Sequence, residues 1–257
     1  MKFVTSNIEQ FKIFYDVVYD VASETIELIF YPDHMTCAVL DRGKTRFFYI
    51  EYEMKFFDEY DVDEGTSICI SLEDMYKLLK LANKTDTLTI SFDESIMSAE
   101  LLSKTGNTRH FEFVLSSEYV ESPQFPQIDL PAHIEVEVAD IKQSVKDIHL
   151  VGTDIFQFVL SENSVTYMSD AMSDTNSYSS VKYAQVVEDV ETGVTDTLAV
   201  RFTLDFIKQM SLFDKISKTV SIDLGEMALV YKFHDEIMGV TVRGMIAPRV
   251  ETMEDEY

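Results

Sequence analysis

The chain has 257 residues and carries 46 Asp and Glu residues against 21 Lys and Arg residues, which gives a formal net charge of −25. This length suits one large domain or two of ordinary size, and a hydrophobic content of 46% supplies a core for each. Taken alone, the charge disfavours a polyanionic partner, and two cysteines without a CxxC pattern disfavour a disulfide or metal framework.

In the first half, the spacing of apolar residues predicts two helices and a series of short strands. The helices are expected at residues 7–22, where Asn7 would cap the helix with its side chain, and at residues 72–82, capped by Ser71. Residues 58–64 are interpreted as an acidic loop. The expected strands cover residues 26–30, 36–40, 45–53, 87–92, 97–103 and 109–115.

Residues 116–133 contain three of the five prolines, which indicates an extended connector. The pattern then restarts with a helix at 140–151, capped by Asp140, and a further helix after Thr203. The expected strands of this half cover residues 134–139, 155–160, 164–168, 178–188, 197–202, 220–224, 228–234 and 239–245.

Two pairs of segments show that the chain repeats itself. Residues 70–92 and 202–224, at a spacing of 132, each contain a polar cap, an amphipathic helix, a polar turn and a short strand. Residues 25–41 and 154–170 are similar at a spacing of 129. We therefore predict an α+β protein of two similar tandem domains, each with two helices packed on antiparallel sheets. The predicted parts are a domain at 1–117, a connector at 118–133, a domain at 134–250 and an acidic tail at 251–257.

The few basic residues concentrate on the expected helices. Lys77, Lys80 and Lys84 fall within about 60° of one another on a helix that turns 100° per residue, opposite its apolar face. Any one such stripe is typical of a solvated helix face. Because the lysine stripe recurs on several helices of a chain rich in carboxylates, we interpret it instead as a surface that faces phosphates. No aromatic residues alternate with the lysines, so stacking on bases or sequence readout is not indicated. The candidate phosphate-facing residues are Lys12, Lys77, Lys80, Lys84, Lys142, Lys146, His149, Lys208, Lys215 and Lys218.

Four segments extend the argument to a known family. They are SLEDMYKLLKLANKTDTLTI, IKQSVKDIHLVGTDIFQF, the proline-bearing connector that ends in IDLP, and MIAPRVE near the C-terminus. Together with the duplication, they make nearly the whole chain resemble the PCNA-type DNA sliding clamps of archaea and eukaryotes. The first helix is poorer in lysine than the family pattern, and Met245 stands where the family commonly has an aromatic residue.

The resemblance implies a non-enzymatic ring, usually a trimer, whose helices enclose double-stranded DNA. Such a ring tethers DNA polymerase and other proteins that carry a clamp-binding motif, and an ATP-dependent clamp loader places it on DNA. Lys77, Lys80 and Lys146 match basic positions that face the hole in the family. With no signal-peptide pattern and no apolar stretch of 18 residues, an intracellular protein without membrane contact is expected. It would lie in the cytoplasm or nucleoid of an archaeal or viral system, or in a eukaryotic nucleus.

The resemblance also implies two contact surfaces. A pocket under the connector would accept a partner's peptide with an aliphatic anchor and an aromatic pair, although such residues by themselves are equally typical of inter-strand core. Edge strands would pair between subunits. The matching pocket positions are Leu40, Lys44, Ile128, Leu130, Met245, Ile246, Ala247 and Pro248. The expected subunit contacts are Arg109, Phe111, Phe113, Tyr178, Val181 and Tyr183.

The sequence shows no catalytic motif, since it lacks a Gly-rich phosphate loop and a GxSxG pattern. Asp61, Asp63 and Glu64 suggest a magnesium site, but a loop of this kind is expected by chance among 46 carboxylates. We therefore expect no enzyme, no metal and no cofactor. The alternatives to a homotrimeric clamp are a subunit of a heterotrimeric clamp, a monomeric viral-type processivity factor, and an acidic DNA mimic that blocks a DNA-binding protein.

Overall fold

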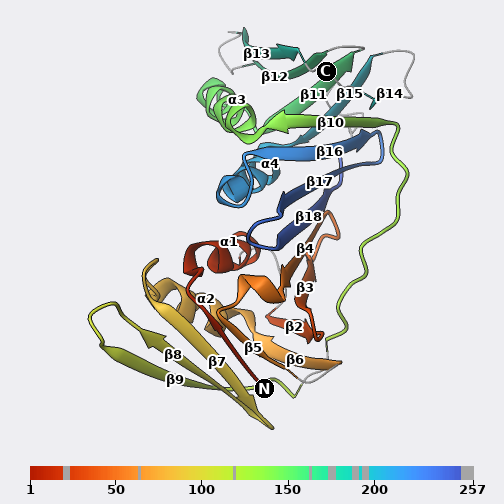
Figure 1. Ribbon diagram of the computed structural model, residues 1–257. Helices are drawn as coiled ribbons and strands as arrows, with labels where there is room; N and C mark the ends of the chain where they lie inside the picture. The colour runs from red at the N-terminus through yellow and green to blue at the C-terminus, as the bar shows by residue number, and fades with distance from the viewer. Residues whose placement is uncertain are drawn as a thin grey trace. The chain divides into compact units, whose positions relative to one another are not determined.

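The computed structural model describes residues 1–19, 24–62, 65–117, 120–161, 164–172, 178–186, 191–192 and 197–249. For the residues of this set that fall between 170 and 196, it describes the backbone and not the side chains. The chain divides into two compact units (Figure 1). One consists of Met1–Pro126 and His234–Arg243, and the other of Gln127–Phe233 and Gly244–Tyr257. The predicted boundaries at 117, 133 and 250 stay predictions.

The first unit holds two helices that contact each other, α1 (Ile8–Val18) and α2 (Leu72–Leu81), and the short 3-10 helix η1 (Met54–Phe56). Strands β5, β1, β7, β8 and β9 pair in that order in an antiparallel sheet, and so do β6, β2, β3 and β4. The strands are β1 (Lys2–Thr5), β2 (Thr25–Phe30), β3 (His34–Leu40), β4 (Arg46–Glu53), β5 (Glu59–Asp61), β6 (Thr66–Ser71), β7 (Thr87–Asp93), β8 (Ile96–Leu102) and β9 (Thr108–Val114).

The second unit holds α3 (Val138–Val151), α4 (Leu204–Met210) and the 3-10 helix η2 (Ser211–Lys215), which contact one another. Strands β13, β12, β11 and β15 pair in that order, and so do β14, β10, β16 and β17. The strands are β10 (Ala132–Glu137), β11 (Ile155–Ser161), β12 (Ser164–Met172), β13 (Tyr178–Val186), β14 (Glu191–Thr192), β15 (Leu198–Thr203), β16 (Thr219–Gly225), β17 (Ala228–Asp235) and β18 (Val240–Ile246). The division between the units runs through β17 and β18.

The strand orders show the duplication directly. The order β6-β2-β3-β4 of the first unit recurs as β15-β11-β12-β13 in the second, and β5-β1-β7-β8 recurs as β14-β10-β16-β17. In both units, a strand leads straight into a helix and a second strand follows. The repeated segments predicted the helix and the strand after it, whereas β6, which leads into α2, was not predicted. The prediction of an α+β protein with two similar tandem domains is therefore confirmed.

Aromatic side chains form the centre of each unit. In the first unit, the ring of Phe3 lies 5.9 Å from that of Phe11 and 5.1 Å from that of Phe57. In the second, the ring of Phe158 lies 5.3 Å from that of Tyr167, edge to face. Full burial of one such side chain contributes about 1.5–3 kcal/mol, so each unit has its own hydrophobic core.

Four local predictions were wrong. Thr203 occupies the cap position of α4, but its side chain makes no cap bond. Asn7 occupies the cap position of α1, but its amide donates to the carbonyl of Phe56 at 2.8 Å and makes no cap bond. Helix α3 begins at Val138, directly after β10, so Asp140 lies inside the first turn and cannot cap it. The acidic loop contains strand β5, because Glu59–Asp61 pairs with β1. Among the described residues, no helix combines the length and apolar character needed to span a membrane.

Candidate nucleic-acid interface and partner surfaces

Helix α2 is built to bury one face and expose lysines on the other. The hydroxyl of Ser71 accepts a hydrogen bond from the Asp74 N–H at 3.2 Å, which confirms the predicted cap, and acidic residues occupy the first turn. Lys77 and Lys80 are exposed, 61% and 50% by side chain. The buried face consists of Leu72, Met75, Leu78 and Leu79.

Both exposed lysines of α2 already have anionic neighbours. The ammonium of Lys77 lies 2.6 Å from the carboxylate of Glu73, one turn earlier, and that of Lys80 lies 3.3 Å from Asp16 on α1. A hydrogen bond with Glu73 raises the pKa of Lys77. The pKa of Lys80 is raised mainly by its contact with Tyr76 and to a smaller extent by Asp16. Both side chains therefore stay cationic at neutral pH, in exposed pairs that solvent screens strongly.

The basic residues of helix α3 differ in their exposure to solvent. Lys146 and His149 are exposed, whereas Lys142 is half-buried and its ammonium lies 2.6 Å from the carboxylate of Asp214. The apolar face of the helix consists of Ile141, Val145 and Ile148, all buried. Lys146 is thus the α3 lysine most available to a phosphate, and Lys142 chiefly links α3 to η2.

Three of the predicted stripe residues lie outside regular α-helix. Lys84 follows the end of α2, because the Asn83 N–H bonds to the carboxylate of Asp86 at 3.0 Å and forms a turn. Lys215 ends the 3-10 helix η2, and Lys218 follows it, with its ammonium on the carbonyl of Asp214 at 2.7 Å. The predicted placement of the basic residues on helices is therefore correct for Lys77 and Lys80 on α2 and for the basic residues of α3. It is wrong for Lys84, Lys215 and Lys218.

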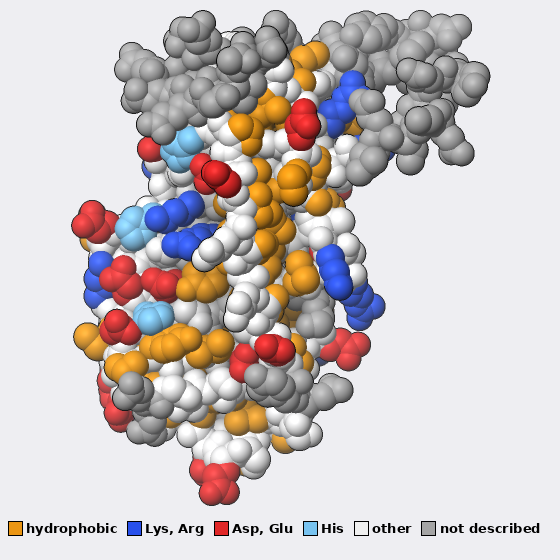
Figure 2. Space-filling model, turned by 90° about the vertical axis from the view of Figure 1, so that its right-hand side faces the viewer, with side chains coloured by type: hydrophobic (Ala, Val, Ile, Leu, Met, Phe, Trp, Pro, Cys, Tyr) orange, Lys and Arg blue, Asp and Glu red, His pale blue; other side chains and the backbone are white. Residues whose placement is uncertain are grey.

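The remaining candidate cations differ in exposure. Lys208 on α4 is exposed, and Leu204 and Ile207 of the same helix are buried. Lys12 on α1 is half-buried and shares its helix with Glu9 and Asp16. On the face seen in Figure 2, in contrast, Lys and Arg side chains lie interspersed with Asp and Glu.

Both predicted subunit edges contain the last strand of a sheet. Strand β9 is the last strand of the sheet that begins with β5, and β13 is the last strand of the sheet that ends at β15. Along β9, the exposed residues alternate with the half-buried Phe111 and Phe113, whose rings stack 6.5 Å apart. The backbones of Tyr178, Val181 and Tyr183 pair with β12. The structure does not describe the side chains of these three residues.

Arg109 has a role that the sequence did not reveal. Its guanidinium donates to the carboxylate of Asp86 at 2.9 Å and to the carbonyl of Leu81 at 3.0 Å. It thus ties β9 to the C-terminal end of α2, where unpaired carbonyls carry partial negative charge. The predicted contact with another subunit stays a prediction, but the side chain is already engaged within its own unit.

The predicted peptide pocket is divided between the two units in sequence. Leu40 and Lys44 belong to the first unit, where Lys44 has a φ of 55° in a turn organised by the buried carboxylate of Asp41. That carboxylate accepts from the Thr45 N–H at 2.7 Å and the Arg46 N–H at 3.0 Å. The turn therefore fixes the direction of the chain after Leu40, the last residue of β3.

In the second unit, the connector and the C-terminal segment are each held in place. A Cβ on Gly225 would lie 2.9 Å from the ring of Pro131 and 3.0 Å from the side chain of Leu130, so only glycine allows this approach. The Arg249 N–H bonds to the carbonyl of Arg201 at 2.7 Å. Ile246 is buried, and the half-buried predicted residues of this unit are Ile128, Leu130, Met245, Ala247 and Pro248.

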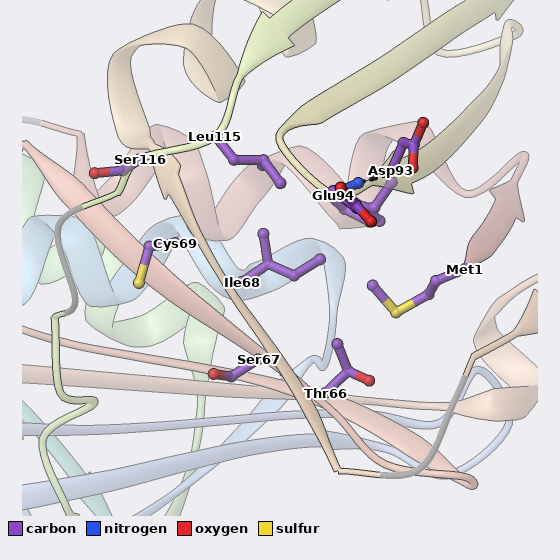
Figure 3. Close-up of a pocket in the computed structure, with 10 residues that line it drawn as sticks. Met1, Thr66, Ser67, Ile68, Cys69, Asp93, Glu94, Leu115 and Ser116 are labelled. Carbon is purple, nitrogen blue, oxygen red and sulfur yellow. Dashed lines mark hydrogen bonds between the residues drawn. The ribbon is translucent and has the colours of Figure 1, made fainter.

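A cavity that the sequence did not indicate lies in the first unit beside β6 (Figure 3). Its volume is about 410 Å³, and Met1, Ile68 and Leu115 are among its lining residues. Asp93 and Glu94 stand at its border, which disfavours an anionic ligand.

Comparisons with known proteins bear on the whole chain. Residues 11–119 match the N-terminal domain of proliferating cell nuclear antigen, PCNA. A protein named DNA polymerase sliding clamp, from Methanothermobacter thermautotrophicus, is 24% identical over 241 residues, 93% of this chain and 94% of that protein. The solved PCNA of Thermococcus kodakaraensis superposes with a TM-score of 0.82 at 18% identity, over 96% of this chain and 99% of that one.

The chain has the PCNA clamp fold. A chain of the solved PCNA2–PCNA3 complex from Sulfolobus tokodaii has the same fold, with a TM-score of 0.80 at 21% identity over 98% of this chain and 100% of that chain. The resemblance of this sequence to the PCNA-type clamps is therefore confirmed. The roles of its individual lysines, edge residues and pocket residues stay predictions.

Proposed function

We propose that this protein is a DNA sliding clamp, in which copies of the chain close into a ring around double-stranded DNA and tether DNA polymerase. The observation that carries the proposal is the similarity to a named DNA polymerase sliding clamp over 93% of the chain, together with a fold that matches solved PCNA over 96% of it. A ring that encloses its ligand needs no catalytic group, and we propose that the protein is not an enzyme.

The charges support a weak and non-specific hold on DNA. Lys77, Lys80, Lys146 and Lys208 are exposed on helices of an acidic chain, where phosphates would attract them while the carboxylates elsewhere avoid the duplex. The neighbouring carboxylates of Glu73 and Asp16 weaken each contact. Retention would therefore depend on enclosure more than on affinity, and sliding would meet little resistance.

The edge strands support the ring. Among the described strands, β9 and β13 each stand last in their sheet with one backbone edge unpaired, and pairing of such edges between copies closes a cyclic assembly. The ring would bind DNA polymerase and other proteins with a clamp-binding motif. An ATP-dependent loader would open it, since the sequence has no phosphate-binding loop of its own.

A second arrangement is favoured by one comparison. The similarity to a chain of the PCNA2–PCNA3 complex fits a subunit that closes a ring only with different chains. The molar mass of the purified chain, measured by light scattering, separates the two: a homotrimer has three times the mass of the chain, and a heterotrimer subunit alone has less.

Topological retention tests the function itself. The protein is threaded at low salt onto a bead-bound linear duplex, the free DNA end is blocked with streptavidin, and the beads are washed with about 0.5 M salt, which screens phosphate contacts. We expect the protein to stay on blocked DNA, to leave unblocked DNA, and to be released when a restriction enzyme cuts the duplex. Equal loss from blocked and unblocked DNA would refute enclosure.

A further inference from the structure

A buried carboxylate lies on the outward-facing side of strand β2. Ile26, Leu28 and Phe30 alternate into the core, which places Glu27 on the opposite face of the strand. Glu27 is nevertheless only 5% exposed, because the connector covers it, and its Oε2 accepts a hydrogen bond from the Ser122 N–H at 3.0 Å. Among the described residues, no lysine, arginine or histidine forms an ion pair with it.

A cavity of about 210 Å³ opens beside this carboxylate. Glu27 and Ser122 contribute polar groups to its wall, and Leu40, Val120 and Pro123 contribute apolar ones. The hydroxyl oxygen of Ser122 is buried and has no hydrogen-bond partner in the part of the chain that the structure describes. A buried carboxylate and an unsatisfied hydroxyl at one cavity are both costly, so each calls for a ligand that supplies donors.

We propose that this cavity binds the lysine side chain of a client peptide, with the ammonium donating to Glu27 and to the Ser122 hydroxyl. The four-carbon stem of lysine lies along Leu40, Val120 and Pro123, as amphipathic side chains do at apolar walls. A compact ammonium with three donors suits one free carboxylate oxygen and one hydroxyl better than a planar guanidinium, which favours two parallel acceptors. An anionic group is excluded, because Glu121 also lines the cavity.

The inference rests on the proposed function, because it assumes that client peptides dock beside the connector. The link is Leu40, which lines this cavity and is also one of the predicted pocket residues. A peptide held by its apolar anchor would place one flanking residue at the cavity. Glu27 would thereby select clients that carry lysine at that position, and it would contribute specificity in addition to the apolar contacts.

A lysine scan tests the proposal with the full-length protein. Fluorescein-labelled peptides share an aliphatic anchor and an aromatic pair and carry a single lysine at successive flanking positions, with norleucine at the same position as the uncharged equivalent. Binding is followed by fluorescence anisotropy. We expect one position at which lysine binds at least about tenfold more tightly than norleucine, and we expect Glu27→Gln to abolish that difference.

The controls separate the possible failures. Glu27→Gln keeps an acceptor for the Ser122 N–H, and an unchanged urea midpoint would show that the connector is intact. Glu94→Gln makes the same charge change on the exposed β7–β8 turn and should keep the lysine preference. A scan without any lysine preference, or a preference that survives Glu27→Gln, overturns the inference while the clamp function stands. If no peptide of the series binds either protein, client binding itself fails, and the inference fails with it.

Discussion

Arg109 on β9 reaches the buried carboxylate of Asp86 at 2.9 Å, and this contact connects the outermost strand of its sheet to the turn that ends α2. The Asp86 side chain is 2% exposed and also accepts from the Asn83 N–H at 3.0 Å. The same carboxylate therefore stops the helix and positions the candidate edge strand. Stability of the unit and geometry of the proposed ring are coupled through this one group.

Replacement of Asp86 should destabilise the first unit. Asp86→Ala removes the carboxylate that accepts from the Arg109 guanidinium and from the Asn83 N–H, so the free energy of unfolding in urea should fall by about 1–3 kcal/mol. Glu112→Ala removes an exposed carboxylate from the same strand and should change it by less than about 0.5 kcal/mol. Equal losses in the two variants would show that the Asp86 contact contributes nothing specific.

The backbone of β9 offers a test of ring closure. The Leu115 N–H bonds inward to the carbonyl of Ser95, so by alternation the N–H of Glu112 points away from β8. Glu112→Pro removes this outward donor while leaving the inward bonds of β9 in place, and we expect a monomer by light scattering. Glu112→Ala keeps the donor and should remain trimeric. A trimer that survives the proline would exclude this edge from the interface.

Charge reversal distinguishes the helix lysines from other cations. Lys77, Lys80 and Lys146 changed together to Glu should weaken duplex binding for every DNA sequence and should lower the slope of log affinity against log salt by about three. The matched control reverses three exposed cations that do not belong to a helix, Arg42, Lys104 and Lys232. Anisotropy at several salt concentrations gives both slopes. If the control loses as much affinity, the helices are not the DNA-facing surface.

The turn at Asp41 should make stability depend on pH. Burial by itself would raise the pKa of this carboxyl, but hydrogen bonds from Arg46 and Thr45 outweigh it and leave the pKa lower in the folded state. The stabilisation is therefore complete above the unfolded-state pKa and declines as pH falls below about 4.

Asp41→Asn provides the measurement for that turn. At pH 7 the variant should lose about 1–3 kcal/mol of unfolding free energy relative to the unaltered protein, because a charged acceptor becomes neutral. The difference should shrink as the pH is lowered through the folded-state pKa, in parallel urea titrations. A difference that stays constant down to strongly acidic pH would contradict the assignment of this carboxylate.

Local sequence pattern was sufficient for much of the fold. The apolar spacing in α2 and the cap at Ser71 predict that helix within one residue of its observed end. The two repeated segments predict a duplicated domain, and the matching strand orders of the two units confirm it. Helix starts that follow a strand directly were less predictable: at α3 the backbone turns before Asp140 without any side-chain cap.

The sequence by itself determined the duplication, the α+β class and the lysine faces of α2 and α3, because periodicity and composition are properties of neighbouring residues. Tertiary structure alone decided which charges meet. Lys80 faces Asp16 from another helix, Arg109 faces Asp86 across 23 positions, and Glu27 receives the Ser122 N–H across 95. Such pairs depend on how elements pack and on what the connector covers, and no local pattern encodes either.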